Sequence, residues 1–505
     1  MTDKAAKQDG ISLAESGRGL GFLSLFVGLA TGGAVYWITT RWIDASTPSP
    51  LSVTVLQSVV VFSAGWLLLS ERNDFVRPII PSAAIAALLA GPTWFMTAAD
   101  QSSRHDLESF PFIFWFFISA PLAGYLSLAL AKSVLETGAP PKYRSVYFHG
   151  LTLPLIAGGA NIFAGLSLIL LFAWAALLKQ MDVKFFSELF DEPWFILPFL
   201  GAVGGLSIAM IRGQQAVLGA LRFMLLLFSR IAMPIMAIFS ITFAIALAAN
   251  GPGAVLDSDF FFGRPGAVVL FLAFAGMLIF NGVYQNGEMS PPPAWLRVST
   301  IAAIALFPVY TGLSAYSLVQ RIGEYGLTPA RIGGAAMTFL AFSYSVVLLV
   351  GLLSEANWRA ARWMPPVAPC NTAMAALWIV VLLGLSSPLF NPWRMSAESQ
   401  ERLLLAGKTS AADFDYGYLR FRLGAYGEAA LNRIENADAH PNSAQFRAGV
   451  DRARRALSYW EYQNRDLVSP DEQSRVPQDD GSDAEGSPPG PLDLELNPQD
   501  APDRT

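Results

Sequence analysis

The sequence has few residues of the kinds that build disulfides, metal sites and catalytic centres. Its one cysteine, Cys370, cannot form an internal disulfide, and its three histidines, His105, His149 and His440, lie far apart. No pair has the His-x-x-x-His or Cys-x-x-Cys spacing of a zinc site. A Walker-type phosphate loop and a Gly-x-Ser-x-Gly elbow are also absent. We therefore predict no metal, no cofactor and no catalytic residue.

Charged residues are scarce as well. They make up 14% of the 505 residues, whereas hydrophobic residues make up 53%. Soluble domains have nearer to 25% charged residues, so this chain is too apolar to be one. Its apolar residues come in runs of about 20, the length that crosses a bilayer core about 30 Å thick. The composition predicts an all-α, polytopic transmembrane bundle whose main partner is the lipid bilayer, with no nucleic acid bound.

We predict eleven spans within a bundle that covers residues 19–390, after an N-terminal segment of residues 1–18. The expected spans are 19–40, 51–70, 79–98, 110–132, 151–178, 194–211, 223–249, 266–284, 296–318, 330–353 and 367–388.

The distribution of lysine and arginine predicts the orientation. With the N-terminus inside, fourteen flanking Lys and Arg residues fall on the inner side and seven on the outer side. Positive residues accumulate on the cytoplasmic side of membrane proteins. We therefore expect a cytoplasmic N-terminus and, after eleven spans, a periplasmic C-terminus.

The character of the chain changes after the last span. Residues 391–464 carry apolar and aromatic residues at helical spacing and predict a small extramembrane helical domain. Ser396 is the expected cap of its first helix, and aromatics such as Phe414 and Tyr416 are the expected surface against the membrane. Residues 465–505 are acidic and poor in large apolar residues, which predicts a disordered tail.

Two pairs of glycines predict close helix packing. Gly28 and Gly32 lie in the first span, and Gly201 and Gly205 lie in the sixth, each pair at GxxxG spacing. Small residues four apart let two helix backbones approach closely. We expect them to pack helices within the chain, with a dimer face as the alternative. Between the fifth and sixth spans, Phe185 to Asp191 predicts a short helix at the interface.

The connection with the most charged and aromatic residues runs from Tyr316 to Arg331, between two long apolar runs. Gly326 can end one helix, because glycine tolerates the left-handed conformation found just past a helix end. Thr328 can cap the next helix, and Pro329 suits its first position. The pattern predicts a tight helical hairpin at a membrane surface.

The charges of this hairpin suggest a binding site. Arg321 is a helical neighbour of Glu324 and of Tyr325. Arg331 falls in the first turn of the second helix, where the helix dipole disfavours a cation unless an anion or a carboxylate such as Glu324 meets it. One interpretation makes these residues interfacial anchors and caps. The other makes Arg321, Glu324, Tyr325 and Arg331 a ligand-binding site for an anionic group.

The pattern Tyr-x-Leu-x-x-Arg-Ile-x-x-Tyr-Gly-Leu-Thr-Pro-x-Arg, which begins at Tyr316, resembles the signature of a bacterial multi-pass membrane family catalogued as domain of unknown function 4153. The segment from Asp413 to Gly427 resembles the part of that family that follows its last span. The resemblance implies a bacterial inner-membrane protein. It implies no activity and no catalytic residue.

Three functions are compatible with the sequence. The first is transport or handling of an anionic solute or lipid, with anionic head groups meeting Arg321 and Arg331. The second is a structural or assembly role, in which the helical domain contacts an envelope protein partner. The third is a membrane-embedded enzyme acting on a lipid-linked substrate with the carboxylates Asp182, Glu188 and Asp191.

Overall fold

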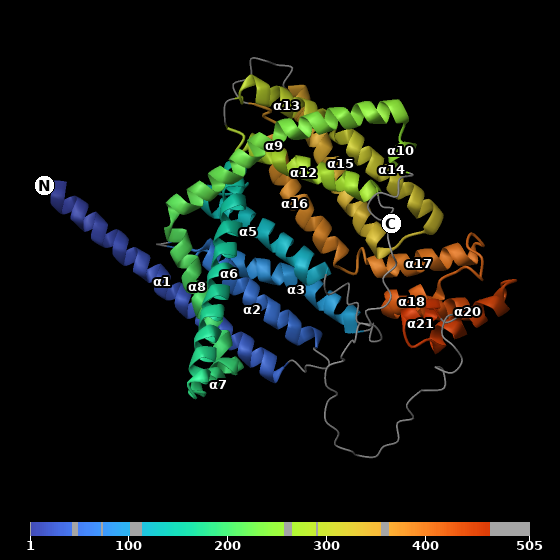
Figure 1. The fold of residues 1–505 in the computed structure, drawn as a ribbon, viewed down its shortest axis with the longest axis horizontal. Helices are drawn as coiled ribbons and strands as arrows, with labels where there is room; N and C mark the ends of the chain where they lie inside the picture. The colour runs from blue at the N-terminus through green and yellow to red at the C-terminus, as the bar shows by residue number, and fades with distance from the viewer. Residues whose placement is uncertain are drawn as a thin grey trace, which may run out of the picture.

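The computed structural model describes residues 2–42, 49–71, 74–101, 114–256, 265–288, 291–354 and 363–464. These residues form α-helices and one π-helix, without a β-strand among them (Figure 1). The predicted acidic tail, residues 465–505, lies outside the described residues. The helices before the C-terminal group are α1 Thr2–Arg41, α2 Pro50–Leu69, α3 Ile79–Gln101, η1 Phe114–Ser119, α5 Ala120–Thr137, α6 Tyr143–Gln180, α7 Phe185–Asp191, α8 Pro193–Gly213, α9 Gln215–Asn250, α10 Gly253–Leu256, α12 Pro265–Tyr284, α13 Ala294–Ala305, α14 Phe307–Tyr325, α15 Pro329–Ser354 and α16 Val367–Leu385.

The described part of the chain contains eleven helical segments that are long and apolar enough to cross a membrane. They coincide in order with the eleven expected spans, which confirms the predicted all-α, multi-pass architecture. The prediction for the ninth span, residues 296–318, is wrong in two respects. The span extends to Tyr325, and it is interrupted at Leu306 between α13 and α14. Pro308 accounts for the interruption, because proline lacks the N–H that would continue the hydrogen bonding of α13 and is well tolerated in the first turn of a helix, where it lies in α14.

The glycine pairs pack α1 against α8. A Cβ atom added to Gly28 would collide with the backbone carbonyl of Gly201, and one added to Gly205 would collide with that of Ser24. Gly32 meets the carbonyl of Leu197 in the same way. Glycine is therefore required along this seam because the two backbones are in direct contact. The predicted intramolecular role is confirmed, and the short helix predicted between spans five and six is α7.

Two cations hold the C-terminal end of α2. Arg212, on α8, donates to the carbonyls of Leu67 at 2.9 Å and Leu68 at 2.7 Å, and also to the carbonyl of Ser70. The buried amine of Lys132, on α5, donates to the carbonyl of Leu69 at 2.8 Å. The last carbonyls of a helix have no partner within the helix. These two side chains supply the missing donors.

The C-terminal helices gather at one end of the molecule, in orange and red at the lower right of Figure 1. They are α17 Pro392–Leu405, α18 Tyr416–Arg422, α19 Gly424–Glu435, α20 Ser443–Arg455 and α21 Tyr459–Asn464.

Two expectations for this group were wrong. The cap of α17 is Asn391, whose side chain accepts from the backbone N–H groups of Trp393 and Arg394, so Ser396 lies inside the helix. Phe414 and Tyr416 are buried in a core shared by these helices, and they do not form a surface against a membrane. The aromatic side chains of this segment therefore pack against the other C-terminal helices.

Candidate functional site

The hairpin between α14 and α15 has the backbone that its sequence predicts. Gly326 has a φ of +71°, a conformation that glycine adopts without strain. The hydroxyl of Thr328 accepts from the backbone N–H of Arg331 at 3.2 Å, and Pro329 is the first residue of α15. Both predicted caps are therefore present, and only three residues separate the end of α14 from the start of α15.

Arg331 closes the hairpin from the second helix. Its Nη1 atom donates to the carbonyls of Tyr325 at 3.0 Å and Gly326 at 2.7 Å, and its guanidinium carbon lies 5.5 Å from the centre of the Tyr325 ring. The suggestion that Glu324 reaches across to Arg331 is replaced by this contact. Arg331 thus binds carbonyl groups at the C-terminal, negative end of the α14 dipole, which provide the negative partner expected from its sequence position. Its Nε and Nη2 atoms carry three N–H groups that these two bonds do not use.

Helix α17 binds the tip of the hairpin. The backbone N–H of Leu327 donates to the hydroxyl of Ser399 at 3.0 Å, and the hydroxyl of Ser396 donates to the Leu327 carbonyl at 3.0 Å. Gln400 Nε2 donates to the carbonyls of Tyr325 and Leu327 at 3.0 and 3.1 Å. The C-terminal helices are thus attached through side chains that hydrogen-bond to the backbone of the hairpin. At an exposed loop tip these backbone groups would otherwise bind water.

A cavity of about 550 Å³ lies beneath this junction. Its walls come from the start of α12, the outer parts of α14 and α15, and the helices α17 and α18. The residues that line it are Gly266, Ala267, Leu270, Ser314, Ser317, Leu318, Arg321, Thr328, Pro329, Ala330, Arg331, Gly334, Thr338, Trp393, Tyr418 and Arg422. We refer to it as the hairpin cavity.

The hairpin cavity is strongly cationic. Arg321 of α14, Arg331 of α15 and Arg422 of α18 line it, and none of the described residues in its wall is acidic. The guanidinium of Arg422 lies 4.9 Å from the Tyr459 ring centre, so this side chain is held by the C-terminal helices. Burial raises the pKa of the Tyr418 hydroxyl, which keeps its proton at neutral pH. The wall therefore contains three guanidinium groups and the protonated hydroxyl of Tyr418.

Apolar and small side chains form the rest of the wall. Leu270, Leu318 and Trp393 line it, as do the glycines at positions 266 and 334. Hydroxyl groups of Ser314 and Thr338 lie 3.4 Å apart deeper in the bundle. The cavity thus combines a cationic part with an apolar part, the arrangement that an anion with a hydrocarbon portion would fit.

The structure brings together two of the four residues predicted for the site. Arg321 and Arg331 line the hairpin cavity, whereas Glu324 and Tyr325 do not and lie exposed on the outer side of α14. Arg422 and Tyr418 were missed because they come from a helix about ninety residues further along the chain. Sequence spacing carries no signal for such a contact. The carboxylates of α7 and its flanks, Asp182, Glu188 and Asp191, are not part of the cavity.

Comparisons with protein-family models, with curated proteins and with solved structures each return no match. In the described part of the chain, no three His, Cys, Asp or Glu side chains come together as metal ligands would. The arrangement can bind and orient an anion through charge-assisted hydrogen bonds, since arginine forks match carboxylate and phosphate geometry.

Proposed function

We propose that this protein transports or handles an anionic solute or lipid in a bacterial inner membrane, with the hairpin cavity as its binding site. The observation that carries the proposal is the convergence of Arg321, Arg331 and Arg422, from three helices, on a cavity whose described wall has no acidic residue. Arginine is rare within membrane segments and marks pathways or binding sites when it faces a cavity.

In this proposal the N-terminus is cytoplasmic and the C-terminus is periplasmic. The charge distribution along the sequence supports it, and the hairpin cavity then opens on the periplasmic side. The hairpin pattern is our reason for placing the chain beside the bacterial family of unknown function named above. The ligand is defined by its chemistry as a carboxylate or phosphate group, carried by either a soluble molecule or a lipid head group.

A scaffold role is the second candidate. Leu457 and Trp460, at the last helix of the C-terminal group, are 79% and 67% exposed. Exposed large apolar residues on an extramembrane part are a feature of protein contacts. An envelope protein that co-purifies with the parent but not with a Trp460→Ala variant would favour this role.

Binding at the hairpin cavity is tested by removing two of its three guanidinium charges. We expect Arg321→Gln combined with Arg422→Gln to weaken binding by 1.5 to 3 kcal/mol for each lost charge-assisted bond, as an order of magnitude. The measurement is the shift in melting temperature of the detergent-purified full chain with phosphatidylglycerol in one arm and glycerol phosphate in the other. The arm in which the melting temperature of the parent rises shows whether the ligand is a lipid or a soluble anion.

Arg394→Gln is the matched control. Arg394 lies on α17 close to the cavity, but its side chain pairs with Glu398 at 2.8 Å and does not line the cavity wall. We expect its ligand-induced shift to equal that of the parent. Equal shifts in the parent, the control and the double variant would contradict the proposal.

A further inference from the structure

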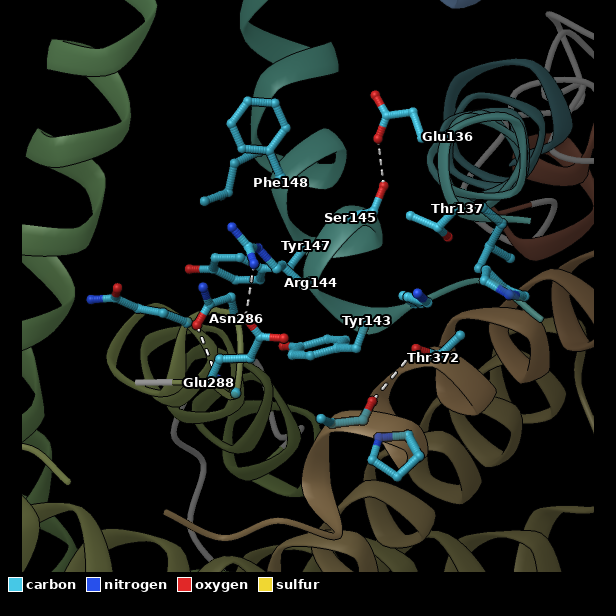
Figure 2. Close-up of a pocket in the computed structure, with 18 of the residues that line it drawn as sticks. Glu136, Thr137, Tyr143, Arg144, Ser145, Tyr147, Phe148, Asn286, Glu288 and Thr372 are labelled. Atoms are coloured by element: carbon cyan, nitrogen blue, oxygen red, sulfur yellow. Dashed lines mark hydrogen bonds and ion pairs between the residues drawn. The ribbon is translucent and has the colours of Figure 1, made fainter. Parts of the chain in front are cut away.

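A second and larger cavity, of about 1450 Å³, lies between α5, α6, α9 and α16 (Figure 2). Its wall includes the connections at residues 140–142 and 285–288, which follow the fourth and eighth spans. The hairpin cavity is instead bounded by the first residues of the eighth span, by the connection after the ninth span and by the helices that follow the eleventh span. When every span crosses the membrane, the connections after even-numbered spans lie on one face and the connections after odd-numbered spans lie on the other. The two cavities are therefore on opposite faces of the bundle.

The carboxylates of this second cavity already have basic partners. Glu288 pairs with Arg144 at 3.1 Å, as Figure 2 shows. Glu136 lies 2.7 Å from His149 Nε2 and accepts from the hydroxyl of Ser145 at 2.8 Å. Both carboxylates are thus engaged by residues other than Arg222.

Arg222, also in this wall, has only neutral partners among the residues that the structure describes. Its Nε atom donates to the carbonyl of Leu218 and its Nη1 atom to the hydroxyl of Thr152, both at 3.3 Å. These distances are beyond the usual range of N–H···O bonds, so the contacts are weak. The guanidinium carbon stacks 4.4 Å from the centre of the Phe148 ring. No carboxylate of the described residues forms an ion pair with Arg222, so its charge remains available to an anion.

One side of the cavity wall, between α6 and α9, is apolar. Leu151, Phe223 and Leu226 line it between α6 and α9, and Phe148 and Phe223 are 44% and 63% exposed. Exposed phenylalanines on two helices that are long and apolar enough to span a membrane place apolar side chains at the opening. A ligand that enters from that side has an apolar part. Basic pockets between transmembrane helices bind the head groups of anionic lipids.

We propose that this cavity is a lateral seat for an anionic phospholipid, with its phosphate on Arg222 and an acyl chain between α6 and α9. Lys142, which also lines the cavity, adds a second positive charge at the head-group end. The seat is a site separate from the hairpin cavity and does not depend on the function proposed for it. Arg222 is then a binding residue.

The test uses phosphatidylglycerol with a photoreactive diazirine on its acyl chain, added to the full chain in detergent. In the parent we expect labelled peptides from α6 and α9. Arg222→Gln should reduce that labelling about tenfold, as expected for the loss of one charge-assisted bond. Gly219→Trp should reduce it as strongly while keeping every charge, because Gly219 lines the cavity and has no atom within 4 Å of an added Cβ.

Arg230→Gln is the matched control, since Arg230 lies two turns further along α9, is exposed and is not in the cavity wall. Its labelling should remain within twofold of the parent. The Arg321→Gln and Arg422→Gln pair should also keep labelling of α6 and α9, which separates this seat from the hairpin cavity. Unchanged labelling in Arg222→Gln and Gly219→Trp would overturn the proposal. Competition by glycerol phosphate, but not by unlabelled lipid, would overturn the lipid as occupant.

Discussion

Replacing Gly28 and Gly201 together with alanine is expected to lower the melting temperature of the protein strongly. Each added Cβ would collide with a backbone carbonyl of the opposing helix, which cannot rotate away as a side chain can. The helices α1 and α8 would have to separate along the whole seam. Overpacking a core costs about 1 to 3 kcal/mol per site, and we expect the upper end of that range here.

The matched control is alanine at Gly33 and Gly204. These glycines lie on the same two helices, and an added Cβ would have no atom within 4 Å. Alanine favours helix over glycine by about 1 kcal/mol, so the control should be as stable as the parent or more stable. Thermal unfolding of the two variants in the same detergent makes the comparison. Equal melting temperatures would show that α1 and α8 do not meet along these glycines.

Replacing Gly326 with alanine is expected to release the hairpin from α17. A φ of +71° costs a residue with a side chain about 1 to 2 kcal/mol. The added Cβ would also collide with the side chain of Leu403 on α17. Both effects push the hairpin tip away from Ser399 and Gln400. We therefore expect faster proteolysis of the C-terminal helices and loss of anion binding at the hairpin cavity.

Gly323→Ala serves as the control for this change. Gly323 lies one turn earlier in α14, and an added Cβ there would meet no atom within 4 Å. Its proteolysis pattern should match that of the parent. If Gly326→Ala left both the proteolysis rate and anion binding unchanged, the attachment of α17 to the hairpin would not be needed for the cavity.

Much of the fold follows from local features of the sequence. Apolar runs of bilayer length predict the spans, because a helix is the only way for a single segment to satisfy its backbone in lipid. The glycine spacing predicts a close helix contact, and Gly326, Thr328 and Pro329 predict the hairpin. The interruption at Leu306 was missed. Pro308 gives a signal for it, but a proline inside an apolar run fits both a kink and a break.

The candidate site depended on contacts between distant segments. Arg321 and Arg331 could be selected because they lie in the hairpin and one of them is at the unfavourable end of its helix. Their surroundings could not be predicted, since Arg422 and the residues of α17 come from the C-terminal helices. Ser396 illustrates the difficulty. Its spacing suggests a helix cap, whereas its hydroxyl donates to the carbonyl of Leu327, 69 residues away in sequence.

The central claim is that an anion occupies the hairpin cavity among Arg321, Arg331 and Arg422. The most direct measurement is a cryo-electron microscopy map of the full chain in nanodiscs of phosphatidylglycerol, with a second map collected in detergent with glycerol phosphate. We predict, in one of the two maps, density for a phosphate at about 2.7 to 2.9 Å from guanidinium nitrogens of this cluster. A cavity without anion density in both maps, or filled only by an acyl chain, would contradict the account.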